Sequence, residues 1–209
     1  MMKANEVGSA LGRATVLFLV ATLALGIVYP VAMCTVAAVA FPWQATGSVI
    51  EVDGVKYGSV LVGQPFAEPG HLWGRPTVAD AGTFQGADGA PLLWYGPENL
   101  SPASDEFAER VQKRVEAVRA ATPEAGDEPV PSDLVTVSGS GFDPHISPAA
   151  AEYQVGRIAR ATGRSEDEVR SIIRACTERP LLGVIGEARV NVLEVNLMLD
   201  GVLDAPPNR

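Results

Sequence analysis

The chain has 209 residues, of which 47% are hydrophobic and 20% are charged, and its formal net charge is −9. This acidic balance argues against binding to nucleic acid and against docking on anionic lipid, because both repel negative charge. Cys34 lies in an apolar run and Cys176 on an expected helix, which argues against a disulfide framework. These cysteines and the histidines His71 and His145 lie too far apart in the sequence to indicate a structural zinc site.

A long uncharged stretch near the N-terminus predicts a transmembrane helix over residues 14–41. At about 1.5 Å per residue, this helix reaches roughly 42 Å, which exceeds the roughly 30 Å hydrocarbon core of a bilayer. Pro30 predicts a kink, and Pro42-Trp43 predicts the end of the helix, with Trp43 suited to the membrane interface. A signal peptide cleaved after Ala38-Val39-Ala40 is the alternative. The apolar stretch is nearly double the usual length of about 7–15 residues, which favours a retained span.

The charges beside this span predict its orientation. Lys3 and Arg13 precede it, whereas Glu51 and Asp53 are the first charges after it. The positive-inside rule therefore predicts a cytoplasmic tail over residues 1–13 and an extracytoplasmic domain over 44–209. That domain carries 14 Lys and Arg against 24 Asp and Glu, a net charge of −10.

The first part of the domain mixes strand and helix signals. Ser48–Val52, Asp53-Gly54 and Val55–Tyr57 predict a β-hairpin with a type I′ turn, and the second strand is expected to extend to Gly63. Residues 79–103 are rich in Gly, Pro, Ala and Asp and predict a loop. Ser104 is expected to open a helix that ends before Pro123, followed by an acidic, proline-rich connector.

The second part of the domain predicts two helices and a strand. Pro148 opens a helix that ends at Gly163, and Ser165 with Glu168 forms a capping box for the next helix. Val190–Leu199 alternates in a way that predicts a strand, in which Asn191 and Asn196 satisfy neighbouring backbone groups. The expected fold is therefore one N-terminal transmembrane helix followed by a single mixed α+β domain.

The segment Asp133–Ser147 gathers polar residues between these elements. Leu134–Val137 predicts a short strand, the Ser/Gly run after it frees the backbone, and Ser147 caps the helix that follows. One hypothesis is a hydrolase centre with Ser140 as nucleophile, His145 as base and Asp143 as its orienting group. The Gly-x-Ser-x-Gly pattern is not met, because position 138 is serine. A hydrogen-bonded turn is the favoured interpretation.

Motifs of energy-coupled transport are missing from the sequence. No lysine is followed by Ser or Thr as a phosphate-binding P-loop requires, and neither an Asp-Lys-Thr-Gly phosphorylation motif nor a Thr-Val-Gly-Tyr-Gly potassium filter occurs. The residues by themselves therefore indicate an anchored α+β domain and stop short of a function.

An ordered set of motifs resembles the C subunit of the Kdp-type potassium-transporting ATPase, the KdpC family. After the single span, the motifs are Gly58-Ser-x-Leu-x-Gly63-Gln64-x-Phe66, Trp73-x-Arg75-Pro76, Asn99-Leu100-x-Pro102-x-Ser104, Pro131 through Pro148, Gln154-Val155 and Gly186-x-x-Arg189-Val-Asn191-Val-Leu193. They cover nearly the whole chain, and their order makes the resemblance specific. Phe142 stands where the family usually has leucine, and Trp94-Tyr95 stands where Ser and Gly are usual.

The resemblance implies a non-catalytic accessory subunit that supports assembly and raises the ATP affinity of its partner. The implied partners are a channel-like subunit that selects potassium and a P-type ATPase subunit that handles ATP and magnesium. A membrane-anchored hydrolase and a stand-alone binding module are the alternatives. Candidates for partner contact or a structural role are Gln64, Arg75, Asn99, Ser138, Ser140, Asp143, His145 and Asn191.

Overall fold

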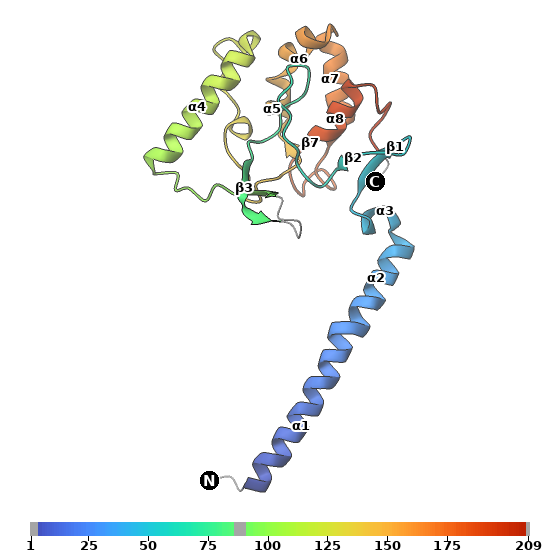
Figure 1. Ribbon diagram of the computed structural model, residues 1–209. Helices are drawn as coiled ribbons and strands as arrows, with labels where there is room; N and C mark the ends of the chain where they lie inside the picture. The colour runs from blue at the N-terminus through green and yellow to red at the C-terminus, as the bar shows by residue number, and fades with distance from the viewer. Residues whose placement is uncertain (1–3, 86–90, 208–209) are drawn as a thin grey trace. The chain divides into compact units, whose positions relative to one another are not determined.

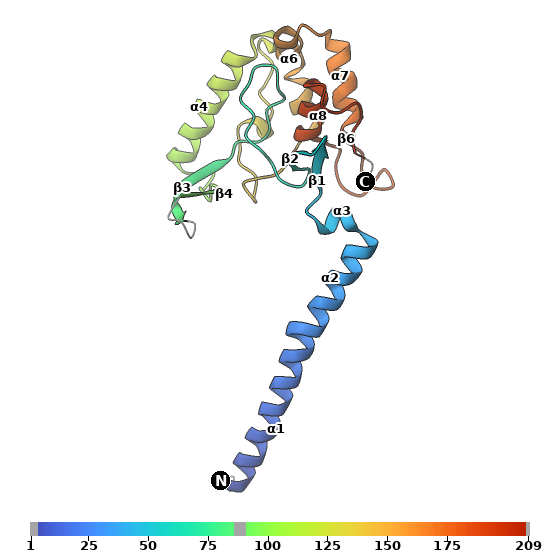
Figure 2. The ribbon, with the colours of Figure 1, turned by 45° about the vertical axis from the view of Figure 1, so that its right-hand side comes forward.

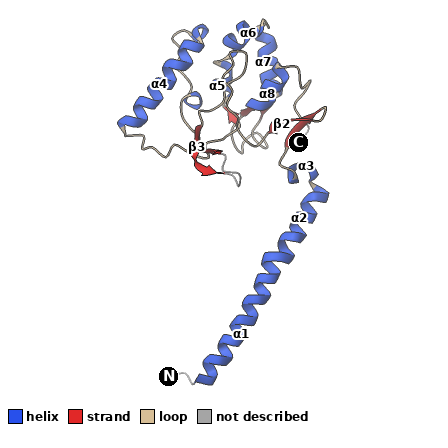
Figure 3. Cartoon of the chain, in the orientation of Figure 1, coloured by secondary structure: helices blue, strands red, loops and turns tan. Residues whose placement is uncertain are grey.

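The computed structural model describes residues 4–85 and 91–207. The chain divides into two compact units, Met1–Val49 and Ile50–Arg209 (Figure 1). The first unit is helical and the second mixes helices with short strands (Figure 3). The α+β class expected for the part that follows the span is therefore confirmed. Neither Cys34 nor Cys176 forms a disulfide.

The first unit contains one helix long and apolar enough to cross a membrane, Gly8–Ala40. It starts earlier than the predicted span and ends at the expected place, before Pro42. A π-helical turn lies directly before Pro30, where the Tyr29 N–H donates to the Ala24 carbonyl. Because proline has no N–H to donate, the regular series of helix hydrogen bonds is interrupted at this point. The kink predicted at Pro30 stays a prediction. The helical segments are α1 (Ala4–Leu23), η1 (Ala24–Val28), α2 (Tyr29–Ala40) and α3 (Pro42–Ala45).

The hairpin predicted around Asp53-Gly54 is confirmed. Strand β1 (Val49–Val52) and strand β2 (Val55–Ser59) form a two-stranded sheet, and both turn residues have positive φ, 52° and 79°, as a type I′ turn requires. The expected extension of β2 to Gly63 is wrong. The Gly63 N–H donates to the Phe142 carbonyl at 2.7 Å, so this stretch is held by a distant loop and not by a strand ladder.

A second sheet stands where the sequence predicts a loop. Strand β3 (Val78–Gln85) pairs antiparallel with β4 (Pro91–Gly96), with an irregularity between Asp80 and Phe84. The loop prediction for 79–103 is therefore wrong over these strands. β3 mixes Ala, Gly and Asp, and β4 is a short continuous apolar run, so neither shows the alternation that identifies a strand in sequence. Pairing between the two neighbouring segments forms the sheet. Trp94-Tyr95 falls on β4, and residues 86–90 lie outside the described part.

The helices of the second unit follow their predicted caps. Ser104 caps α4 (Asp105–Ala121), and the capping box of Ser165 and Glu168 opens α7 (Glu166–Ala175). The helix opened by Pro148 is split, because the chain turns at Tyr153-Gln154 before continuing to Gly163, whose φ is 70°. Its two parts are α5 (Pro148–Glu152) and α6 (Val155–Thr162), and one-turn 3-10 helices occupy Pro123–Ala125 (η2) and Ser132–Leu134 (η3).

The last element is mostly a helix and not the predicted strand. Strand β7 (Arg189–Asn191) is the centre of an antiparallel sheet with β5 (His145–Ile146) and β6 (Thr177–Glu178) on its sides. It gives way at Asn191 to α8 (Val192–Leu199), in which every residue except Met198 is buried. A helix that is buried on all sides has no polar face, so its sequence lacks the 3.6-residue period by which an amphipathic helix is recognised. Its apolar residues can then fall at alternate positions, as they do in a strand.

The predicted strand Leu134–Val137 is also wrong. Ser132–Leu134 forms η3, and the chain continues without strand pairing. Leu134 and Val135 are both buried although they are adjacent in sequence. Burial of adjacent side chains fits a turn that presses into the core and does not fit a strand, whose neighbouring side chains point to opposite faces.

Three buried amide side chains fix the segment before β3 onto the C-terminal helices. Asn196 accepts from the Leu72 N–H at 2.7 Å and donates to the Leu72 carbonyl at 3.0 Å. Gln154 holds the Trp73 backbone in the same way, at 2.8 and 3.1 Å. Asn191 donates to the Val60 carbonyl at 2.8 Å. The expectation that Asn191 and Asn196 satisfy backbone groups is confirmed.

Arg157 is a buried cation that contacts the same segment before β3. Its guanidinium lies 4.2 Å from the centre of the Trp73 ring and donates to the Pro69 carbonyl at 2.5 Å and to Gln154 at 2.6 Å. Burial lowers the pKa of Arg157 to about 10, so it keeps its charge at neutral pH. Helices α6 and α7, side by side in Figures 1 and 2, pack with α8 around this core.

Candidate functional site

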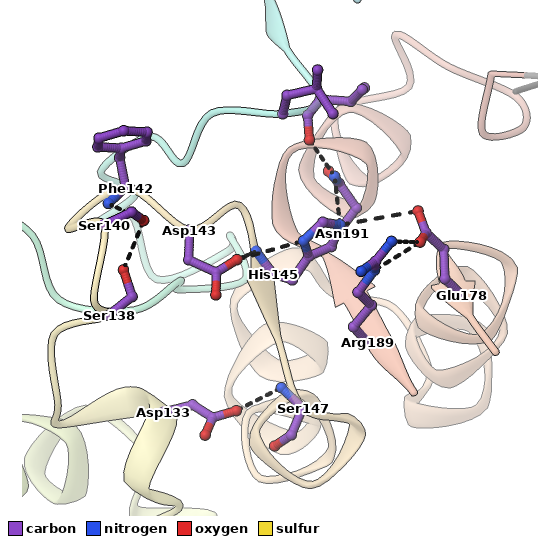
Figure 4. Close-up of polar contacts among 12 residues, drawn as sticks. Asp133, Ser138, Ser140, Phe142, Asp143, His145, Ser147, Glu178, Arg189 and Asn191 are labelled. Atoms are coloured by element: carbon purple, nitrogen blue, oxygen red, sulfur yellow. Dashed lines mark hydrogen bonds and ion pairs between the residues drawn. The ribbon is translucent and has the colours of Figure 1, made fainter. Parts of the chain in front are cut away.

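The segment Asp133–Ser147 is here named the polar corner (Figure 4). Two of its aspartates, Asp133 and Asp143, hold it in shape by accepting hydrogen bonds from backbone N–H groups. Asp133 accepts from the Ser147 N–H at 2.6 Å, which ties the start of the corner to the start of α5. Asp143 accepts from the His145 N–H at 3.0 Å and so closes a turn around Pro144. The local sequence favours this turn, because aspartate readily bonds the backbone two residues later and proline restricts the residue before it.

The two serines cap the same loop. The Ser138 hydroxyl accepts from the Gly141 N–H at 2.9 Å and lies 3.2 Å from the Ser140 hydroxyl, which accepts from the Phe142 N–H at 3.3 Å. Ser138 is buried and Ser140 is exposed. In Figure 4, Asp143 lies between this serine pair and His145. The geometry therefore favours a hydrogen-bonded turn over a nucleophile that passes its proton to histidine.

His145 lies between two carboxylates and an amide. Its Nδ1 is 3.5 Å from Asp143, and its Nε2 is 4.0 Å from Glu178 and 3.5 Å from the Asn191 amide nitrogen. The sheet creates this arrangement, because His145 pairs directly with Asn191 across β5 and β7 and Glu178 lies on the neighbouring β6. These contacts hold the imidazole in one orientation.

Arg75 and Asn191 join segments that are distant in sequence, whereas Gln64 bonds within its own neighbourhood. Arg75 donates to the Thr136 carbonyl and hydroxyl, both at 3.2 Å. Gln64 donates to the Tyr57 carbonyl at 3.1 Å. Asn191, besides its bond to Val60, accepts from the Glu194 N–H at 3.1 Å and caps α8. These three candidates thus have structural bonds within the chain.

Asn99 lies outside the Asp133–Ser147 segment but shares a hollow with Ser138. It is exposed with φ 51° and lines a hollow of about 200 Å³ together with Ser138. The preceding Glu98 binds Arg114 at 2.8 Å and Arg110 at 3.0 Å, which holds the pKa of the Glu98 carboxyl below its ordinary value. The ion pairs fix this loop onto α4.

A groove of about 300 Å³, here named the charged groove, brings several candidates together. It is lined by Arg75, Asp133, Asp143, His145, Ile146, Ser147, Glu187, Ala188 and Arg189. Of the eight candidates, Arg75, Asp143 and His145 lie in it, and Ser138, Ser140 and Asn191 lie next to these residues in chain or sheet. Gln64 borders a small neighbouring hollow that also touches Arg75 and Asp143.

Arg189, which lines the charged groove, and Glu178, which contacts two of its lining residues, were not among the predicted candidates. Arg189 pairs with Glu178 at 2.6 Å, and both residues come from strands that meet only in the folded sheet. The signal that could have found Glu178 is the short polar stretch between α7 and the turn at Pro180. Over residues 4–85 and 91–207, no three His, Cys, Asp or Glu side chains are placed to hold a metal ion. With both signs of charge and a polar lining, the groove suits recognition of a polar protein surface.

The long apolar helix and the mixed helix and strand content define a membrane-anchored α+β protein. Comparison with known proteins agrees with this class. The family model described as "K+-transporting ATPase, c chain" matches residues 11–201. A KdpC subunit of a potassium-transporting ATPase from Clostridium perfringens is 51% identical over 185 residues, covering 88% of this chain and 93% of the relative. The one from Sorangium cellulosum is 51% identical over 188 residues, covering 90% and 95%. The one from Koribacter versatilis is 39% identical over the full length of both.

The chain therefore belongs to the KdpC family and is a subunit of a potassium-transporting ATPase. The resemblance found in the ordered motifs is confirmed. The long apolar helix and the family together indicate a membrane-anchored protein.

Proposed function

We propose that the chain is a non-catalytic accessory subunit of a high-affinity, ATP-driven potassium uptake complex. In this proposal it supports assembly of the complex and raises the ATP affinity of the P-type ATPase subunit. That partner handles ATP and magnesium, and a channel-like subunit selects potassium. The relatives' names, which describe a subunit of a potassium-transporting ATPase, support the setting.

The accessory role is supported by the hydrogen bonds of the polar corner, whose side chains bind their own backbone and leave no activated nucleophile. Asp133, Asp143, Ser138 and Ser140 all accept hydrogen bonds from backbone N–H groups of their own loop. A nucleophile needs a base within hydrogen-bond reach, whereas the Ser140 hydroxyl bonds a serine and a backbone amide. A preformed loop beside the charged groove supports a contact surface for a partner subunit.

The flanking charges support an orientation with the N-terminus in the cytoplasm and residues 44–209 outside. A domain outside the membrane is separated from a cytoplasmic nucleotide site by the bilayer. Any effect on ATP affinity is then allosteric, and a coupling free energy of about 1–3 kcal/mol is typical of such effects. Co-purification in mild detergent with mass measurement of the partners tests membership of the complex.

Reporter fusions test the orientation. A reporter that is active only outside the cytoplasm, fused after Arg209, is expected to be active. A reporter that is active only inside, fused at the same position, is expected to be silent. The opposite pattern would reverse the proposed topology and make direct contact with ATP possible.

Substitutions in the corner test the accessory role. Ser140→Ala removes two long hydrogen bonds of an exposed side chain, so potassium-dependent ATP hydrolysis by the assembled complex should stay nearly unchanged. Asp143→Ala removes the bond to the His145 N–H and should weaken assembly by about 1–3 kcal/mol, measured as recovery of partner subunits. Asp143→Asn keeps the acceptor and is the matched control. Ester hydrolysis by the purified chain that Ser140→Ala abolishes would instead establish a hydrolase.

A further inference from the structure

A short hairpin after β6 carries four exposed aliphatic side chains, and residues 181–185 are here named the apolar tip (β6 is labelled in Figure 2). Leu181 pairs with Ile185, and the chain reverses at Leu182 and Gly183, whose φ angles are 54° and 77°. The exposed fractions are 67% for Leu181, 84% for Leu182, 81% for Val184 and 59% for Ile185. Single exposed aliphatic residues are ordinary, but four within five residues form a patch that indicates an apolar contact.

The backbone of the apolar tip bonds to itself. The Leu181 and Ile185 N–H groups each donate to the other residue's carbonyl, at 2.9 and 3.0 Å. The Gly183 N–H donates to the Pro180 carbonyl at 3.0 Å and the Val184 N–H to the Leu181 carbonyl at 3.2 Å. Backbone groups that enter hydrocarbon must be bonded internally, so this hairpin meets the requirement for a lipid environment over most of its length.

Composition favours lipid over a protein partner. Residues 180–186 contain only Pro, Leu, Gly, Val and Ile, and none of them is charged. Protein interfaces concentrate their binding energy in Trp, Tyr and Arg, while Leu and Val are under-represented there. The apolar tip has no side chain that forms hydrogen bonds, so it suits the hydrocarbon interior of a bilayer, where binding depends on hydrophobic area and not on a matching shape.

The chain keeps this unit close to a bilayer. Eight residues, 41–48, separate the end of α2 from the start of β1. Fully extended, they span at most about 28 Å, so the second unit stays near the membrane that holds the apolar helix. A tether of this kind raises the effective concentration of a second contact, and a weak apolar insertion is then sufficient.

We propose that the apolar tip inserts its aliphatic side chains into the membrane leaflet next to the domain and forms a second membrane contact. The net charge of −10 on residues 44–209 opposes attachment to anionic head groups, so the contact is apolar in origin. The insertion depends on the anchoring helix and is independent of which side of the membrane the domain faces.

Spin labels on the full chain in nanodiscs of phosphatidylcholine and phosphatidylglycerol test the proposal. Cys34→Ala removes the exposed thiol, while the buried Cys176 stays, and a sample without an added cysteine gives the blank. A label at Val184→Cys should collide strongly with oxygen, which concentrates in lipid, and weakly with a water-soluble nickel complex. A label at Lys113→Cys, an exposed site on α4, should show the reverse.

A second substitution shows whether the aliphatic side chains cause the insertion. Leu182→Glu in the chain labelled at position 184 should lower the oxygen collision rate and raise the nickel rate toward the values at position 113. Equal collision rates at 184 and 113 in the unsubstituted tip would overturn the proposal. A label that is open to nickel in the chain alone and shielded from both reagents after addition of the partner subunits would assign the tip to a protein contact and would also overturn it.

Discussion

Replacing Gly141 with alanine is expected to lower the free energy of unfolding by about 2–6 kcal/mol, a large part of the stability of an ordinary domain. Two effects add. Gly141 has φ 80°, a left-handed conformation that strains other residues, and a Cβ at this position would overlap the backbone carbonyl of Gly96 at the end of β4. Chemical denaturation of the purified full chain in detergent, followed by circular dichroism, measures the change.

Gly139→Ala is the matched control for Gly141. It lies in the same Ser/Gly run, a Cβ there would have no atom within 4 Å, and its φ is outside the left-handed region. Its stability should therefore stay within about 0.5 kcal/mol of the parent chain. Equal losses in the two variants would mean that general stiffening of the loop, and not the contact with β4, governs the corner.

Glu194→Gln is expected to stabilise the chain more strongly as the pH rises. Glu194 is buried at the start of α8, and burial raises its pKa to about 7. The folded state holds the proton more tightly than the unfolded chain, whose pKa is near 4.5. Stability from this group is therefore complete below about pH 4.5 and is lost as the pH rises through 7, by about 2–3 kcal/mol in all. Glutamine does not ionise and avoids the loss.

Denaturation at pH 5, 6, 7 and 8 measures this difference. The difference in free energy of unfolding between Glu194→Gln and the parent should grow from pH 5 to pH 7 and level off by pH 8, widening by about 2 kcal/mol over that range. Asp127→Asn, an exposed site on the connector, should leave the pH profile unchanged. The lowered pKa values of Glu98 and Glu168 act in the opposite direction, since their contribution is lost only as the pH falls below about 4.5. A gap that does not depend on pH would contradict the assignment to Glu194.

Local sequence determined the features that depend on near neighbours. The apolar helix, the Asp53-Gly54 turn and the caps at Ser104, Ser147 and Ser165 were all predictable, because each needs only a few adjacent residues. The ordered motifs also determined the family. The motifs named Arg75, Asp143 and His145 as separate candidates, and only the folded chain brings these three residues into one groove.

Tertiary structure decided the features that depend on burial and distant pairing. Val192–Leu199 is a helix because the core surrounds it on every side and Asn191 caps its start, and neither condition is visible in a run of alternating apolar residues. The charged groove exists because β5 pairs with β7, which brings His145 and Arg189 into one lining. Pairing of β6 with β7 then places Glu178 beside both residues. Side-chain periodicity reports the local conformation only where one face meets water. Once both faces are buried, packing between distant segments determines the structure.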